Sequence, residues 1–394
     1  MLVIVAPGQG AQSPGFLSAW LEVPGVEERL DWFSAVCGED LVRHGTTSDA
    51  DTIRDTAIAQ PLLVASGLLA ALALFPHPSD AFKVVGAVAG HSVGEITAAA
   101  GAGVITAEAA LVLVRERGRA MAVASAATPT GMTAVLGGDP EEVDAALARH
   151  GLTAANRNGA GQVVAAGTLE QLAALAEDAP AKARLRPLSV AGAFHTVHMA
   201  PAVKHLAHYA RSVTTHDPRT RLISNRDGEV VHDGHDVLTR IVHQVGSPVR
   251  WDLCLRTMAD LGVTALIEVP PAGTLTAIAK RELPDVQALA LKTPADLDAA
   301  RALVAAHATV STLDDSPTWR LLVAPAKGTF RTSDLPAGTA LRPGTTVGTL
   351  VTRRDSQDVT APHGGTVVEW LVEDGDPVDP GQPLIRLHPE AVPA

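Results

Sequence analysis

The fold is decided by one stretch of the sequence, Val84-Val85-Gly86-Ala87-Val88-Ala89-Gly90-His91-Ser92-Val93-Gly94-Glu95. Its apolar start, residues 84–89, predicts a buried strand, and the alanine-rich pattern over Glu95–Ala102 predicts a helix. Between them lies G-x-S-x-G, which is typical of a nucleophile elbow, a strained turn that exposes a serine hydroxyl. Side chains two residues before and after Ser92 would collide in such a turn, so glycine stands at both positions. A glycine-rich turn that only packs tightly is the alternative.

The same order of strand and helix continues along the first 290 or so residues, where short apolar runs alternate with longer Ala- and Leu-rich patterns. Such alternation predicts an α/β fold with a mainly parallel sheet. The clearest strand candidates are Leu2–Ala6, Val84–Ala89, Ala134–Leu136, Val163–Ala166, Arg221–Ser224 and Ala265–Val269. From about 128 to 190 the order becomes βαββαβ, with helices expected at Pro140–His150 and Leu169–Glu177. We interpret this segment as a small subdomain inserted into a larger one.

The last quarter of the chain differs in composition and contains an internal repeat. An Ala-rich helix and a polar linker, together residues 296–318, indicate a domain boundary. Beyond it, Ala324-Pro325-x-x-Gly328-Thr329 recurs as Ala361-Pro362-x-x-Gly365-Thr366, at an offset of 37 residues. The turn glycines and several apolar positions recur at the same offset. Two such halves predict a small symmetric β-sandwich over residues 319–390.

Composition excludes several classes of protein. The chain has 394 residues, of which 46% are apolar and 19% charged, as expected of a folded globular protein with more than one domain. A net charge of −12 argues against binding to nucleic acid or to an anionic membrane. The two cysteines, Cys37 and Cys254, have no metal-site spacing and suit a reducing compartment. The start of the chain lacks a basic leader, and the longest apolar stretch, residues 61–75, predicts a buried helix. We therefore expect a cytoplasmic protein without a metal.

Two backbone segments are candidates for holding an oxyanion beside Ser92. The helix that follows the serine offers the free N–H of Val93. The loop Gly8-Gln9-Gly10-Ala11-Gln12 follows the first strand, so it should lie at the same carboxyl edge of the sheet and could supply a second donor. A phosphate loop and a plain turn are the alternatives, and the phosphate loop is disfavoured because no Lys-Ser/Thr pair follows.

An arginine and a histidine complete the candidate set. Arg117 lies in a predicted helix, 109–124, where its neighbours three and four residues away are all apolar. A buried arginine needs an anionic partner, which is either a substrate carboxylate or a distant Asp or Glu. Among 15 histidines, His195 ends an apolar run and precedes a helical stretch, as a catalytic base should, although His198 could serve equally. His91 should point away from the Ser92 side chain.

Taken together, these motifs resemble the malonyl-CoA:acyl carrier protein transacylase family over residues 1 to about 295. The matching segments are Gly8-Gln9-Gly10-Ala11-Gln12, Gly90-His91-Ser92-Val93-Gly94-Glu95, Arg117-Gly118, Gly192-Ala193-Phe194-His195, and Gln244 with Pro248-Val249-Arg250-Trp251. The resemblance implies an α/β-hydrolase-like large subdomain with a ferredoxin-like insert. It also favours His195 as the base.

The resemblance implies a ping-pong reaction through an acyl-serine. His195 takes the proton of Ser92, backbone N–H groups of Gln9 and Val93 hold the oxyanion, and Arg117 binds the malonyl carboxylate. The backbone carbonyl of Gln244 would orient His195, giving a Ser–His pair without an acid. Residues implied to line the pantetheine path are Gln60, Asn156, Asn158 and Gln162. Phe194 is implied to favour malonyl over bulkier branched groups.

The C-terminal repeat resembles a biotinyl/lipoyl attachment domain, a flattened barrel-sandwich with two similar halves. In that family the modified lysine lies in a hairpin, and the corresponding residue here is Arg354. A guanidinium cannot form the amide to biotin or lipoate, so we expect no covalent cofactor. We expect the domain to dock another protein or subunit, or to stabilise the chain.

Three other functions stay open at this point. A serine esterase or thioesterase would share the elbow and the base but would not need Arg117. A non-catalytic adaptor would act through the C-terminal domain. A polyketide carrier could replace the fatty-acid carrier as the malonyl acceptor. Since the chain is acidic, a local basic patch would have to bind an acidic carrier protein, and the candidates are Lys182, Arg184, Arg186, Lys280 and Arg281.

Overall fold

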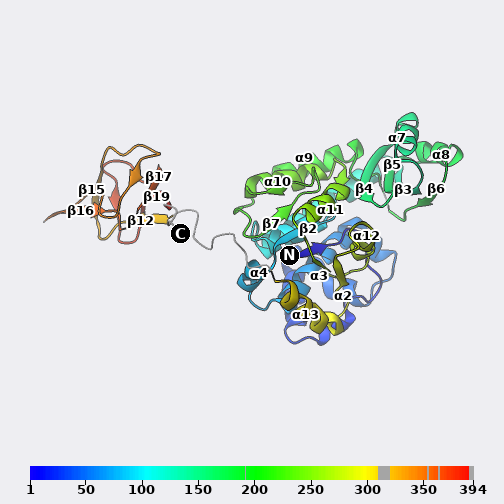
Figure 1. The fold of residues 1–394 in the computed structure, drawn as a ribbon, viewed down its shortest axis with the longest axis horizontal. Coiled ribbons are helices and arrows are strands. Elements are labelled where there is room, and N and C mark those ends of the chain that lie inside the picture. Colours follow the sequence, from blue (N-terminus) through cyan, green and yellow to red (C-terminus); the bar gives the residue numbers. More distant parts are fainter. Residues whose placement is uncertain (191, 309–319, 353–354, 363, 390–394) are drawn as a thin grey trace. The chain divides into compact units, whose positions relative to one another are not determined.

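A computed structural model describes residues 1–190, 192–308, 320–352, 355–362 and 364–389. The chain divides into two compact units, Met1–Thr312 and Leu313–Ala394, drawn in Figure 1. The helix expected before the boundary is α13 (Leu297–His307). Leu297 and Ala300 of this helix are buried in the core of the first unit, so α13 is part of that unit and not of a linker.

The first unit is built on a six-stranded sheet with the strand order β11-β10-β1-β2-β7-β8, parallel except for β8. Its strands are β1 (Leu2–Ala6), β2 (Ala87–Gly90), β7 (Arg221–Ile223), β8 (Val230–Val231), β10 (Ala265–Glu268) and β11 (Gln287–Ala290). The predicted strand at 2–6 is confirmed. The strand predicted at 84–89 begins three residues later, because Pro78–Val84 form the short helix α4.

Helices cover both faces of this sheet, as a buried parallel sheet requires. Besides α4, the α-helices of this unit outside the smaller subdomain are α1 (Val26–Cys37), α2 (Leu41–Thr46), α3 (Thr56–Leu74), α5 (Gly94–Gly101), α6 (Ala107–Ala127), α9 (Ala200–Ala210), α10 (Gly234–Gln244), α11 (Trp251–Asp260), α12 (Thr274–Glu282) and α13. In the described part of the chain, α3 alone has the length and apolar composition of a membrane span. Since 72% of its 18-residue apolar stretch is buried within the fold, it is the core helix predicted at 61–75.

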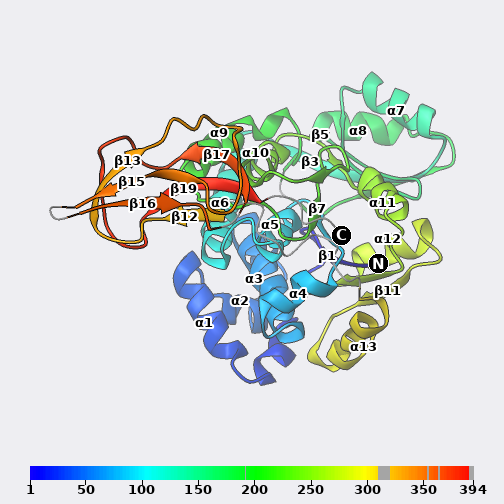
Figure 2. The same cartoon turned by 60° about the vertical axis from the view of Figure 1, so that its left-hand side comes forward.

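A smaller subdomain carries a five-stranded sheet in the order β6-β3-β5-β4-β9. Its strands are β3 (Thr130–Gly137), β4 (Thr153–Gly159), β5 (Gln162–Thr168), β6 (Ala183–Pro187) and β9 (Val249–Arg250). Helices α7 (Pro140–Arg149) and α8 (Leu169–Glu177) cover one face, where Val135, Leu147 and Leu175 are buried (Figure 2). The βαββαβ order is confirmed, but the fifth strand comes from residues 249–250. Two residues are too few to show a strand period in the sequence.

The second unit consists of two four-stranded sheets, β12-β19-β17-β14 and β16-β15-β13-β18. Its strands are β12 (Arg320–Val323), β13 (Gly328–Thr332), β14 (Ala340–Leu341), β15 (Thr346–Val351), β16 (Ser356–Thr360), β17 (Gly365–Trp370), β18 (Pro377–Val378) and β19 (Pro383–Pro389). Strands β13, β14 and β15 recur as β17, β18 and β19 at the offset of 37 residues. Strands β12 and β16 correspond in the same way. When each strand of one sheet is replaced by its counterpart, the strand order of the other sheet results, which confirms the predicted symmetric sandwich.

Candidate active site

The turn between β2 and α5 has the geometry of a nucleophile elbow. Ser92 adopts a left-handed backbone conformation with φ of 54°. A Cβ added to Gly90 would lie 1.9 Å from the carbonyl carbon of Gly94, and one added to Gly94 would lie 2.2 Å from the carbonyl oxygen of Ala6. Both neighbours are backbone atoms that cannot move aside. The collision predicted for these positions is therefore real, although the one at Gly94 is with β1 and not within the turn.

The Ser92 side chain contacts His195 directly. The distance from Ser92 Oγ to His195 Nε2 is 2.8 Å, and His195 Nδ1 lies 2.7 Å from the backbone oxygen of Gln244. A carbonyl oxygen only accepts, so Nδ1 carries the proton and Nε2 is free to accept one from Ser92. His91 points away, as predicted, and its Nε2 lies 2.8 Å from Asn158 Oδ1. The choice left open between His195 and His198 thus falls on His195 by geometry.

The environment of His195 keeps its imidazole neutral. Its side chain is almost fully buried, and this burial, together with the positive charge of Arg117, lowers the pKa of His195 to about 3. The hydrogen bond to the Gln244 carbonyl opposes the shift. A neutral imidazole is the form that can remove a proton from a hydroxyl group at neutral pH.

Arg117 lies in α6, is 1% exposed, and reaches the side chain of Ser92. Its Nη1 donates to Gln60 Oε1 at 2.6 Å, and its Nη2 donates to Gln244 Oε1 at 3.0 Å and to Ser92 Oγ at 3.4 Å. Nε has no partner in the described part of the chain. Burial lowers the pKa of Arg117 to about 10, while the charge of Glu95 opposes this. Among the described residues no carboxylate is hydrogen-bonded to Arg117, so the distant ion pair considered as an alternative does not form.

A cavity of about 460 Å³ opens onto Ser92 and His195. Six of the other predicted residues also line it, namely Gln9, Gln60, Asn156, Asn158, Gln162 and Phe194. Apolar residues that sequence reasoning missed line it too: Met121, Met132, Leu188, Val190, Leu275 and Ile278. These residues come from α6, the small subdomain and α12. No periodicity in the sequence reports which apolar side chains face a cavity and which face the core.

Two backbone N–H groups beside Ser92 are without a hydrogen-bond acceptor in the described structure, those of Gln9 and Val93. Val93 is buried at the start of α5, and Gln9 lines the cavity. The Gln9 side chain is held by its Nε2, which donates to the backbone oxygen of Arg54 at 3.1 Å. Unpaired donors next to a nucleophile can receive a developing negative charge.

Comparison of this chain with known proteins shows its family. The family model described as the acyl transferase domain matches residues 28–306. The malonyl CoA-acyl carrier protein transacylase of Mycobacterium tuberculosis strain H37Rv is 53% identical over 298 residues, which cover 76% of this chain and 98% of the relative. The protein of the same name from Escherichia coli K12 is 34% identical over 305 residues, covering 75% and 97%. The chain therefore belongs to the acyl transferase family, which includes these malonyl CoA-acyl carrier protein transacylases.

Solved structures of the same family match the first unit of this acyl transferase. The crystal structure of MCAT from Mycobacterium tuberculosis has a TM-score of 0.74 at 53% identity, covering 76% of this chain and 99% of that one. A type II PKS acyl-carrier protein has been solved in complex with its malonyl-transacylase. The matching chain of that structure has a TM-score of 0.70 at 29% identity, over 76% of this chain and 99% of its own length.

The acyl transferase also contains a buried polar cluster that sequence reasoning missed. Glu95 is 2% exposed, and burial raises the pKa of its carboxyl to about 7. It accepts hydrogen bonds from the Gln244 side chain and from the backbone N–H of Asn225. Gln244 was expected to act through its backbone oxygen alone, whereas its side-chain amide also links Glu95 to Arg117. The only signal in the sequence was the position of Glu95 directly after the elbow.

Proposed function

We propose that the chain transfers a malonyl group from malonyl-CoA to the phosphopantetheine thiol of an acyl carrier protein, for fatty-acid or polyketide synthesis. The observation that carries the proposal is Arg117, a buried cation next to Ser92 to which no carboxylate of the described residues is hydrogen-bonded. A malonyl thioester bound to Ser92 would bring a carboxylate to this guanidinium, and Arg–carboxylate pairs are strong when buried. Membership of the family supports the same substrate and acceptor.

The geometry supports a two-step reaction with Ser92 as nucleophile and His195 as base. Nε2 of His195 takes the proton of Ser92, and Oγ forms a bond to the thioester carbonyl carbon. The N–H groups of Val93 and Gln9 would hold the oxyanion. The carbon–sulfur bond then breaks, and the proton on His195 leaves with the thiol of coenzyme A. The carrier thiol next attacks the serine ester, giving its proton to His195, which returns it to Ser92.

The remaining cavity residues have three proposed roles. Asn156, Asn158 and Gln162 reach the cavity from β4 and β5, and we propose that their amides line the pantetheine path. Gln60 has a different contact, because its Oε1 accepts a hydrogen bond from Arg117. We therefore propose that Gln60 orients the arginine more than it binds pantetheine. Phe194 would narrow the acyl end of the cavity and favour malonyl over branched groups.

We propose that the carrier protein approaches along the exposed edge of β6. Arg184 is paired with Leu136, and Arg186 with Ala134, and residues directly opposite one another share a face of the sheet. Ala134 lines the cavity, so both exposed arginines lie on the cavity side. Leu188, also exposed, continues this line to the cavity itself. This edge would bring basic charge to an acidic carrier, whereas Lys280 and Arg281 at the end of α12 have no comparable support.

Charge reversal tests this edge. The double variant Arg184→Glu and Arg186→Glu should raise KM for the carrier about tenfold or more, because two attractive contacts become repulsive. Acylation by malonyl-CoA alone should not change. Arg149→Glu, on the helix that covers the opposite face, is the matched control. An equal effect of the control would refute the assignment.

Intact mass tests the main proposal. The purified chain is incubated with malonyl-CoA, quenched in acid and weighed, with Ser92→Ala beside it. A stable gain of one malonyl group that is absent from Ser92→Ala is the expected result. Free malonate without an adduct would favour an esterase or thioesterase. Neither adduct nor turnover would favour an adaptor acting through the second unit.

For the second unit we propose a biotinyl/lipoyl-like sandwich that carries no cofactor, and for the larger subdomain an α/β-hydrolase-like fold. The exchange symmetry of the two four-stranded sheets supports the former. Arg354, at the expected attachment position, lies outside the described residues. A docking or stabilising role for this unit, and a cytoplasmic location for the whole chain, remain part of the proposal.

A further inference from the structure

The side chain of Asn225 is hydrogen-bonded to the backbone of the Ser92 turn and has no role in the proposed reaction. The parallel pairing of β2 with β7 ends at Ala89 and Ile223. Beyond this point, the side chain of Asn225 takes over the pairing. Its Oδ1 accepts the backbone N–H of Ser92 at 2.8 Å, and its Nδ2 donates to the backbone oxygen of Gly90 at 2.7 Å. Asn225 is 0% exposed, so water does not compete for either bond.

These two bonds act on the strained part of the turn. A left-handed conformation is unfavourable for a residue other than glycine, so it persists only where the surroundings enforce it. The N–H of Ser92 points into the protein and needs an acceptor there. The backbone angles of Ser92 set the direction of its Oγ toward His195 and also that of the next N–H, on Val93. One clamp therefore fixes the nucleophile and an oxyanion donor together.

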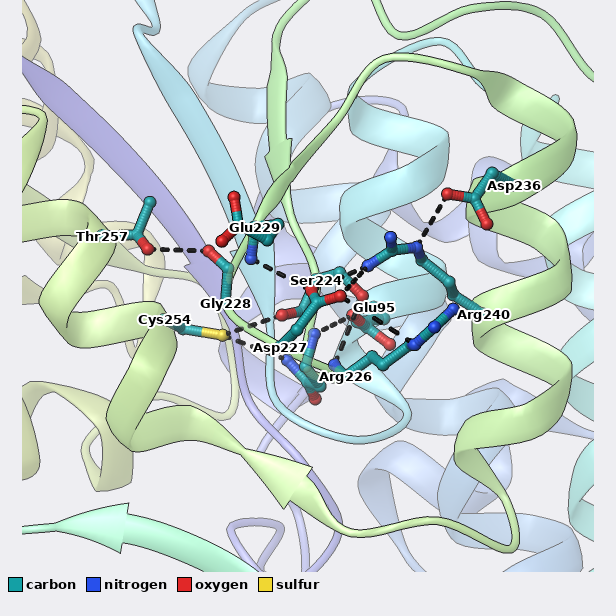
Figure 3. Close-up of polar contacts among 11 residues, drawn as sticks. Glu95, Ser224, Arg226, Asp227, Gly228, Glu229, Asp236, Arg240, Cys254 and Thr257 are labelled. Atoms are coloured by element: carbon teal, nitrogen blue, oxygen red, sulfur yellow. Dashed lines mark hydrogen bonds and ion pairs between the residues drawn. The ribbon is translucent and has the colours of Figure 1, made fainter.

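Asn225 is itself fixed by the polar contacts of the loop that carries it, and the contacts of Glu95, Asp227 and Gly228 in this region are drawn in Figure 3. Its backbone N–H donates to Oε1 of the buried Glu95 at 2.5 Å. The loop that carries it, residues 224–229, is anchored from the side of α10, where Arg240 Nη1 donates to both carboxylate oxygens of Asp227 at 2.7 and 2.9 Å. From α11, Thr257 Oγ1 donates to the backbone oxygen of Gly228 at 2.7 Å.

Glu95 links this clamp to the rest of the site. One carboxylate oxygen accepts from the Asn225 backbone, and the other accepts from Nε2 of Gln244. The same Nε2 lies 3.1 Å from the backbone oxygen of Ser92 and 3.2 Å from Asn225 Oδ1. Since the donor end of Gln244 is held in this way, its acceptor end faces Arg117.

We propose that Asn225 is a positioning residue for the nucleophile, which holds the Ser92 turn through its amide, and that Glu95 keeps Asn225 in place. Neither residue touches the acyl group. The inference rests on the proposed function only for its substrate readout, because the reactivity of Ser92 can be measured without malonyl-CoA.

The test compares two reactions of Ser92 in the full-length chain. Phosphonylation by a fluorophosphonate reports the nucleophile alone, and single-turnover acylation by malonyl-CoA reports the reaction. In Asn225→Ala, both rates should fall about 10- to 100-fold, since small displacements of a catalytic group have effects of this size. KM for malonyl-CoA should stay within about twofold, because Arg117 and the cavity lining are untouched. Glu95→Gln removes the oxygen that accepts from Gln244 and weakens the support of Asn225. It should lower the phosphonylation rate by a smaller factor, and this rate carries the comparison if Asn225→Ala does not fold.

The matched control is Thr257→Val, which keeps the side-chain shape but removes one hydrogen bond to the same loop. It should lower thermal stability slightly and leave both rates unchanged. Phosphonylation within twofold of the wild-type rate in the folded Asn225 or Glu95 variant would overturn the inference, as would an equal loss of rate in Thr257→Val. Wild-type chain that is phosphonylated but forms no malonyl adduct would instead refute the proposed function and leave the positioning result standing.

Discussion

Replacing Arg117 by methionine separates a substrate-binding arginine from a structural one. Methionine is flexible and apolar and fills similar space, but it has neither a positive charge nor a hydrogen-bond donor for a carboxylate. Removing one partner of a buried charge pair costs about 3–5 kcal/mol. If the malonyl carboxylate is that partner, kcat/KM for malonyl-CoA should fall by about 10²- to 10⁴-fold. Acylation by acetyl-CoA, which has no carboxylate, should not fall.

The effect on stability should be small, and its size follows from the surroundings of Arg117. Burial lowers the pKa of Arg117 from 12.5 to about 10, which corresponds to about 3 kcal/mol against the charged form in the folded state. At pH 8 the guanidinium is protonated both folded and unfolded, so this whole cost is present and methionine relieves it. Against this stands the loss of the two shorter hydrogen bonds, to Gln60 and Gln244, at about 1.5 kcal/mol each. The third bond, to Ser92 Oγ at 3.4 Å, is long and adds little. The two contributions nearly cancel.

Two measurements test the prediction. Single-turnover acylation is followed by intact mass with malonyl-CoA and acetyl-CoA, and the free energy of unfolding is measured in urea at pH 8. We expect a large loss for malonyl-CoA alone and a change in stability below about 1.5 kcal/mol. A loss of about 3 kcal/mol or more in stability, or equal losses with both thioesters, would refute the reasoning and make Arg117 structural.

Three further predictions concern the base, the elbow and the second unit. Because the pKa of His195 is lowered to about 3, the imidazole stays neutral on acidification, and the rate of Ser92 phosphonylation should not follow a titration near pH 6.5; a tenfold fall per pH unit below 6.5 contradicts this. Gly90→Ala should destabilise by more than about 4 kcal/mol in urea unfolding, whereas Gly101→Ala, with no atom within 4 Å of the new Cβ, should change stability by less than about 1 kcal/mol. A chain of residues 1–308 should fold and be acylated at the full rate, since the second unit has a hydrophobic core of its own; a tenfold lower rate would show that this unit supports the site.

The parts of the site that are local in sequence could be predicted from it. The elbow needs only a strand, a helix and two glycines within five residues, and each has a clear sequence signal. The motif around His195 is also local, but its meeting with Ser92 is not, because 103 residues separate the two. The residues alone left His198 as an equal candidate, and only the family resemblance favoured His195.

The contacts behind the elbow could not be predicted in this way. Asn225 reaches Ser92 across 133 residues, and Gln244 reaches Glu95 across 149. These contacts depend on β2 and β7 being neighbouring strands of the sheet and on the residue at which each strand ends and its loop begins. An asparagine after a strand looks like any loop asparagine, because neither sheet order nor register is visible in a single sequence.

The symmetry of the second unit bears on how such a structure can arise. Each of its sheets takes two strands from residues 320–351 and two from residues 356–389. A half of the unit, on its own, would keep only one strand pairing, β13 with β15 or β17 with β19. Two copies of one half, related by a two-fold axis, would restore every pairing. Two identical half-length chains could therefore form the same two sheets, and the single chain differs from such a dimer only by the covalent link between its halves.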